Sequence, residues 1–362
     1  MLYKEDWDKV RKRFEALWER EIIDRCCISV MAPKKSGFQV PSTSKTYDSP
    51  DDLEERRKYW SDPDTILKKY ITRFENTYHG GEALPEIFLN LGAAGNANYF
   101  GSKAVYGKTS IWFDPIMETI DSEKVKFEPN SELYVKGKEI AKYLCKEGKN
   151  KFFVSMPDNA VGIDVLSHLI GADNLLMELY DKPDEIKKAV KIIKDNWVHV
   201  SSEFYDIIRD CNYGGSCVGW LNTWAPNTHA QIQCDMSVMI SKPMFDEFVM
   251  DELRCGSEEL KYPLYHLDGQ EQIRHLDSLL SIEKLKMIQW TSVEGQPPAT
   301  DFIPTLKKIQ EAGKCLLLNV RPRYVEKLMT ELSSKGLYIV TDCETVDEAD
   351  SLVKLVEKLT HE

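Results

Sequence analysis

Eight short apolar runs alternate with helix-like segments along the chain, and this alternation constrains the fold most strongly. Most of the runs are continuous rather than alternating, which is typical of parallel strands covered on both faces. The runs are residues 27–31, 87–91, 152–156, 216–220, 263–267, 285–290, 315–320 and 337–341. The clearest helical segments are residues 6–20, 133–147, 182–210, 243–260, 302–312, 323–332 and 346–359. This order predicts an α/β fold, most simply a (β/α)8 TIM barrel, with an open doubly wound sheet as the alternative.

The sequence predicts one domain, because nothing in it indicates a domain boundary. No low-complexity linker or change of composition divides the 362 residues, so we expect a single barrel domain over residues 1–362 with an N-terminal helical extension. The connections at residues 32–85 and 92–130 are long. We expect them to form long loops over the barrel mouth, where such insertions build an active site.

Composition excludes several classes of protein. A net charge of −12 without a basic block argues against nucleic acid as a partner. No stretch of 18 apolar residues occurs, so no membrane span is expected. The nine cysteines contain no CxxC pair, and the N-terminus is charged and amphipathic rather than a signal peptide. We therefore expect a cytoplasmic protein with mostly inert cysteines.

Polar and aromatic residues collect where the predicted strands end, and in a barrel those ends share one pocket. For substrate binding we select Asn90, Asn222, Trp224, Trp290 and Asn319. The tryptophans could form flat walls for a ring-shaped ligand or could equally fill the core.

Two further groups carry candidate chemistry. Asp235, in a polar break after the fourth run, and Glu294, after the sixth, are candidate catalytic carboxylates. His266, Asp268 and Cys343 offer nitrogen, oxygen and sulfur to an ion such as zinc. Period two puts His266 and Asp268 on one face of a strand. From spacing alone, a capped turn with an inert cysteine is the better explanation of these three residues.

Four segments together resemble the uroporphyrinogen decarboxylase superfamily. They are "AQIQCDMSVMISKPMFDEFVMDEL", "YPLYHLDG", "CLLLNVRPRYVEKLM" and "GLYIVTDCETVDEADSLVKLVEKL", in that order and spacing. The resemblance covers roughly residues 85–360 and implies a TIM barrel. One branch of the superfamily decarboxylates uroporphyrinogen without a cofactor, using an arginine-rich segment after the first strand and an aspartate after the second. Here "MAPKKSGF" follows the first run and Asn90 stands near the aspartate position, so this branch is disfavoured.

The other branch consists of methyltransferases that move a methyl group between a corrinoid and a thiol or small methylated substrate. Its motif is His-x-Cys with a distant Cys, and all three residues bind zinc. The resemblance maps the histidine to His266 and the distant cysteine to Cys343, while Asp268 replaces the middle cysteine. It thus implies a methyltransferase with Zn²⁺ at His266, Asp268 and Cys343, although the aspartate makes the ligand set harder.

No corrinoid-binding signature of the form Asp-x-His-x-x-Gly occurs in the chain. We therefore expect methylcobamide or cobalamin to be carried by a separate corrinoid protein, with a small methyl donor or thiol acceptor as the other partner. Two alternatives remain open at this point. One is a metal-free decarboxylase or lyase that uses Asp235 or Asp268 for proton transfer. The other is a non-catalytic protein that binds a tetrapyrrole or cobamide.

Overall fold

The computed structural model describes residues 1–35, 38, 49–293 and 295–362. Strands coincide with all eight predicted apolar runs, and further strands lie between them. The strands are β1 (Cys27–Pro33), β2 (Thr77–Gly81), β3 (Glu86–Leu89), β4 (Lys103–Tyr106), β5 (Ile111–Asp114), β6 (Phe153–Pro157), β7 (Ser216–Val218), β8 (Thr223–Ala225), β9 (His229–Ile232), β10 (Tyr262–Asp268), β11 (Met287–Thr291), β12 (Cys315–Asn319) and β13 (Leu337–Asp342).

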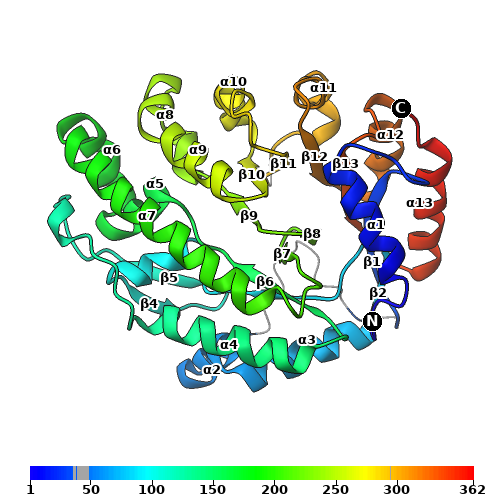
Figure 1. Cartoon of the computed structure of the whole chain (residues 1–362), viewed down its shortest axis with the longest axis horizontal. Helices are drawn as coiled ribbons and strands as arrows, with labels where there is room; N and C mark the ends of the chain where they lie inside the picture. The colour runs from blue at the N-terminus through cyan, green and yellow to red at the C-terminus, as the bar shows by residue number, and fades with distance from the viewer. Residues whose placement is uncertain (36–37, 39–48, 294) are drawn as a thin grey trace.

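Helices separate most of these strands and lie outside them along an arc that runs from α4 through α7 and α9 to α13 (Figure 1). The α-helices are α1 (Trp7–Trp18), α2 (Leu53–Ser61), α3 (Pro63–Asn76), α4 (Glu132–Gly148), α5 (Gly162–Ile170), α6 (Ala172–Asp181), α7 (Pro183–Ile208), α8 (Lys242–Phe248), α9 (Met250–Glu259), α10 (Leu276–Leu280), α11 (Ile303–Glu311), α12 (Val325–Glu331) and α13 (Val346–Leu359). Short 3-10 helices include η3 (Asp235–Met239) and η6 (Pro322–Tyr324). None of the helices in the described ranges is both long and apolar enough to cross a membrane.

The main sheet has the order β2-β1-β13-β12-β11-β10-β9. All of its neighbouring strands are parallel except β2, which runs antiparallel to β1. This arrangement brings the carboxyl ends of β1 and β9 to β13 to one edge, where ligands bind in α/β folds.

The strand pairing does not show the closed barrel expected from the sequence. In the part of the chain that the structure describes, β3 pairs with β6, and β7 with β8, separately from the main sheet. The β3–β6 register shifts between Ile87 and Leu89, and β7 turns back after three residues. Both irregularities interrupt continuous backbone pairing. The structure thus shows a mixed α/β fold with a parallel sheet.

The two segments expected to be loops contain regular structure instead. Helices α2 and α3 and strand β2 lie within residues 32–85, and the β4–β5 hairpin lies within residues 92–130. Periodicity did not reveal α2 because it is short and strongly charged. Its start is fixed by Asp52, whose side chain accepts a hydrogen bond from the backbone N–H of Glu55 at 2.9 Å. The segment predicted as one helix over residues 243–260 is divided into α8 and α9.

Helix α1 covers the inner face of the strands at their amino ends. Its buried side chains, including Phe14 and Trp18, pack in one cluster with Leu264, Met287 and Leu317 from β10, β11 and β12. The intervening residues of those strands face the outer helices in a second, larger cluster. The N-terminal helical extension therefore closes one end of the sheet and leaves the carboxyl ends of the strands for the site.

Candidate functional site

Strand β10 directs His266 and Asp268 to the inner side of the sheet. Leu264 packs against α1, so with period two the side chains at 266 and 268 share its face. Tyr265 and Leu267 point the other way, into the core beneath the helices. His266 is buried and Asp268 is half-buried at the carboxyl end of the strand. The imidazole of His266 is therefore shielded from solvent, whereas the carboxylate of Asp268 is partly accessible at the end of the strand.

The neighbouring strand fixes the orientation of His266. Gln289 on β11 lies directly opposite His266 in the parallel register, and its Oε1 lies 2.5 Å from Nδ1. Gln289 Nε2 donates to Thr291 Oγ1 at 2.6 Å, which leaves Oε1 as the acceptor. His266 Nδ1–H is therefore the donor, and Nε2 carries the free lone pair. Such a hydrogen bond to the other ring nitrogen is typical of a metal-ligating histidine.

Asp235 comes to the same place from the next strand. It begins η3, just after β9, and its backbone N–H donates to Asp164 Oδ2 at 2.8 Å. The N–H of Met236 donates to the other oxygen of Asp164 at 3.0 Å. Asp164 thus anchors the start of η3, while Gln233 Nε2 donates to Asp235 Oδ2 at 3.1 Å.

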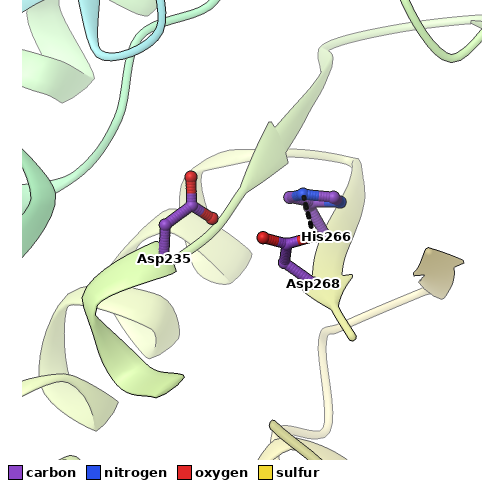
Figure 2. Close-up of side chains that lie close together, drawn as sticks. All are labelled: Asp235, His266 and Asp268. Carbon is purple, nitrogen blue, oxygen red and sulfur yellow. Dashed lines mark ion pairs between the residues drawn. The ribbon is translucent and has the colours of Figure 1, made fainter. Parts of the chain in front are cut away.

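Asp235, His266 and Asp268 point toward one another (Figure 2), and one ligand atom from each lies within 4.8 Å of the others. His266 Nε2 lies 3.9 Å from Asp268 Oδ1. Burial, followed by the charges of Asp268 and Asp158, raises the pKa of Asp235 to about 7. The shift thus reflects burial first and neighbouring negative charge second, and either a shared proton or a cation would relieve both.

A third carboxyl group, that of Asp158, lies close to this cluster. Gln231 Nε2 donates to Asp158 Oδ1 at 2.7 Å. Burial raises the pKa of Asp158 to about 6, although this hydrogen bond and the charge of His266 oppose the shift. Asp158 follows β6, so the outer part of the site draws on β6, β9 and β10 together.

The cluster fits a divalent metal. It offers one imidazole nitrogen and two carboxylates, a donor set that zinc and harder transition metals accept. Asp235 Oδ1 is buried and makes no hydrogen bond within the described ranges, so this oxygen has a free bonding position. His266 Nε2 points to the same place with its lone pair free.

Cys343 lies outside this group. It follows β13, and its backbone N–H donates to Met31 O of β1 at 2.8 Å. Three strand positions separate β13 from β10 in the sheet. Burial raises the pKa of the Cys343 thiol to about 11, which keeps it protonated at neutral pH. The structure thus brings Asp235, rather than Cys343, to His266 and Asp268.

A cavity of about 1130 Å³ opens at the carboxyl ends of the strands and includes His266 and Asp268 in its wall. The predicted substrate residues Asn90, Asn222 and Asn319 also line it. Asn222 has a structural task as well, because its side chain bonds both backbone groups of Leu84 at 3.0 Å.

The other predicted substrate residues lie away from the cavity wall. Trp224 packs edge-on against Trp7 of α1, and its Nε1 donates to Asn212 O at 3.0 Å. Trp290 points outward from β11 and packs 4.9 Å from the ring of Phe302. Both tryptophans are in the core. Glu294 lies outside the described residues.

The sequence interpretation did not assign a role to Gln289. A usable signal was present, because Gln289 is a polar residue near the end of the run 285–290, where only Lys286 is also polar. A buried amide in a strand needs a partner, and the parallel register supplies His266. Asp158 was visible as a strand-end residue, but its link to Gln231 depends on β9, a short strand with two polar residues.

Comparisons with known proteins give an informative likeness among the solved structures. No protein-family model matches the chain, and no curated protein matches its sequence. Among solved structures, a methyltransferase from Methanosarcina mazei matches with a TM-score of 0.61 and 12% sequence identity. The match covers 96% of this chain and 98% of that chain. At this identity, the likeness shows that the two proteins share a fold over nearly their whole lengths.

Proposed function

We propose that this protein is a metal-assisted methyltransferase built on a uroporphyrinogen decarboxylase-like barrel. The observation that carries the proposal is the convergence of Asp235, His266 and Asp268 within 4.8 Å at the carboxyl ends of the strands. The whole-chain likeness to a solved methyltransferase supports the same class. On this view β3, β6 and β7 complete the ring by packing beside the main sheet, since among the described strands they pair separately from it.

Asp235, His266 and Asp268 would hold the metal, for which zinc is our choice. Zinc bound there would keep a thiol substrate in its deprotonated, nucleophilic form. Gln289 holds the His266 ring so that Nε2 faces the site, and Asp164 holds the backbone of Asp235. In this arrangement Asp158 is not a ligand but a neighbouring carboxyl that can exchange a proton with the site.

The methyl group would move between the small substrate and a corrinoid on a partner protein. The corrinoid would supply the methyl group, so that the substrate sulfur would form the new bond to carbon and the electrons of the broken bond would stay with the corrinoid. The cavity at the strand ends gives the substrate room. The partner would have to approach over the same end, since α1 covers the opposite end of the sheet.

Metal content tests the ligand assignment. Protein purified with zinc supplied should hold about one zinc ion per chain, measured by mass spectrometry of the metal. Asp235→Asn and Asp268→Asn should lose it, while Cys343→Ser should keep it. If Cys343→Ser loses the ion and Asp235→Asn does not, the ligand set is His266, Asp268 and Cys343. Activity is then assayed with free methylcobalamin and 2-mercaptoethanol, by following the loss of the cobalt–carbon absorption band.

A metal-free decarboxylase or lyase is the second candidate. It is favoured by Asp235 Oδ1, a buried carboxylate oxygen without a hydrogen bond in the described structure, which could accept a substrate proton. Chelation separates the two functions: release of carbon dioxide that persists in metal-free protein would support the lyase. Loss of methyl transfer on chelation, restored by zinc, would support the methyltransferase.

A further inference from the structure

Four cationic side chains line the cavity without forming an ion pair with any described carboxylate. They are Lys69 and Arg73 of α3, and Arg321 and Arg323 next to β12. Some helix lysines elsewhere pair with a carboxylate at helical spacing, such as Lys191 with Asp195 at 2.5 Å and Lys242 with Asp246 at 2.6 Å. Others, such as the exposed Lys68, pair with no described carboxylate, so the informative feature is that four such cations gather around one cavity. In a chain with a net charge of −12, unneutralised cations around one cavity indicate a function for that charge.

Lys69 lies against aromatic rings rather than a carboxylate. Its Nζ lies 3.7 Å from the centre of the Tyr59 ring and 5.6 Å from that of Tyr70. Burial, together with the charge of Arg73, lowers the pKa of Lys69 to about 7. Aromatic faces attract the ammonium group but do not replace the hydration that it has lost.

Arg73 lies one helical turn beyond Lys69 and faces the same cavity. Its guanidinium carbon lies 5.0 Å from the centre of the Tyr70 ring. Like charges at this spacing repel each other. A shared anion would remove the repulsion, and a guanidinium can bind an oxyanion through two parallel hydrogen bonds.

The topology gives the cavity two chemically different ends. Helix α3 leads directly into β2, whose Thr77 pairs with Pro33 at the carboxyl end of β1. Arg321 follows β12, and only β13 lies between β1 and β12 in the sheet. The cationic groups thus gather at the β1–β12 end, where Asp342 at the end of β13 also lines the cavity. His266 and Asp268 on β10 line the other end, and Asp235 lies beside them after β9.

We propose that the substrate carries an oxyanion, such as a carboxylate, which Lys69 and Arg73 bind while its reacting group lies at Asp235, His266 and Asp268. Arg321 and Arg323 add attraction at the rim. The position of the reacting group rests on the proposed function, whereas the anion site rests on α3 alone. The substrate is then an elongated molecule that is anionic at one end.

Binding of simple anions tests this inference without turnover. The probes are butyrate, sulfate and inorganic phosphate, with butyramide as the uncharged match to butyrate, measured by titration calorimetry. We expect butyrate to bind and butyramide not to bind. Arg73→Gln and Lys69→Met should each weaken butyrate binding about tenfold or more, as expected for loss of a charged hydrogen bond. Stronger binding of sulfate or phosphate than of butyrate would identify the oxyanion as tetrahedral rather than a carboxylate.

Lys68→Met is the matched control, because Lys68 is the exposed neighbour of Lys69 on α3. It should bind butyrate like the wild type. Asp268→Asn should also bind butyrate normally while losing zinc, which separates the anion site from the metal site. Equal binding of butyrate and butyramide, or equal effects of Arg73→Gln and Lys68→Met, would overturn the inference while leaving the metal assignment intact.

Discussion

At the scale of single residues, Lys69 should destabilise the folded protein. Its pKa of about 7 in the fold compares with 10.5 for an ordinary lysine. Between these values the unfolded chain binds more protons than the folded chain, so the free energy of unfolding rises with pH across this window. Lys69→Met removes the buried charge, and we expect it to raise that free energy by about 1–3 kcal/mol below pH 7. The difference in the free energy of unfolding between Lys69→Met and the wild type should shrink as the pH approaches 10.5.

Urea denaturation at a series of pH values measures this effect. Lys68→Met serves as the comparison, since its ammonium group is exposed in both states. A variant that gains stability while losing anion binding would show that the loss is not caused by unfolding. If Lys69→Met is no more stable than Lys68→Met at any pH, then Lys69 is not held in a desolvated position.

The sequence predicted part of the site at this scale and could not predict the rest. Period two on one strand was sufficient to place His266 and Asp268 together. The third member depends on how distant strands are ordered. Cys343 and Asp235 both follow strands, but β9 pairs with β10, whereas β13 lies three positions away. Strand β9, "HAQI", is short and contains two polar residues, so it could not be predicted from an apolar run.

At the scale of elements, the start of α3 positions the proposed anion site. Asp62 accepts hydrogen bonds from the backbone N–H of Thr65 at 2.8 Å and from its hydroxyl at 2.7 Å. We expect Asp62→Ala to lower the free energy of unfolding by about 1 kcal/mol, the usual loss for an N-cap. It should also weaken butyrate binding, because the first turn of α3 orients Lys69 and Arg73.

Chemical denaturation and calorimetry provide the two measurements. Asp62→Asn should retain most of the stability, because asparagine caps helices as well as aspartate does. Glu75→Ala near the other end of α3 is the control, since Glu75 is exposed. A normal affinity in Asp62→Ala would mean that the packing of α3, rather than its cap, sets the positions of the two cations.

Also at this scale, strands were easier to predict than helices and hairpins. Buried parallel strands are continuous apolar runs, so all eight runs were found, with boundaries that shift by a few residues. Strand β2 contains "TYHGG", and the α2 segment "LEERRKYWS" is mostly polar. Such elements are held by caps and by pairing with β1, neither of which gives a periodic pattern. The order of the strands in the main sheet also depends on long-range pairing that periodicity cannot specify.

At the scale of the whole molecule, one buried carboxylate joins the covering helix to the sheet. Glu82 is fully buried, and its oxygens accept hydrogen bonds from Arg13 of α1 at 3.0 Å and from Arg25 at 2.7 and 2.9 Å. The backbone N–H of Ile28 in β1 donates to it at 2.8 Å. The same carboxylate therefore contacts α1, the segment before β1 and β1 itself.

Removal of the Glu82 carboxylate should lower the free energy of unfolding far more than the loss of one exposed ion pair does. Glu82→Ala would leave the Arg25 guanidinium buried without the carboxylate that it binds, whereas Arg13 would keep its pair with Asp24 at 2.6 Å. We expect a loss of about 3–5 kcal/mol in the free energy of unfolding. Glu15→Ala, also on α1, breaks only the exposed pair with Arg11 at 3.6 Å and should cost less than about 1 kcal/mol. Guanidinium denaturation compares the two variants. Equal losses would mean that apolar contacts such as those of Phe14 and Trp18 suffice to hold α1, and that the buried charges contribute little to closing this end of the sheet.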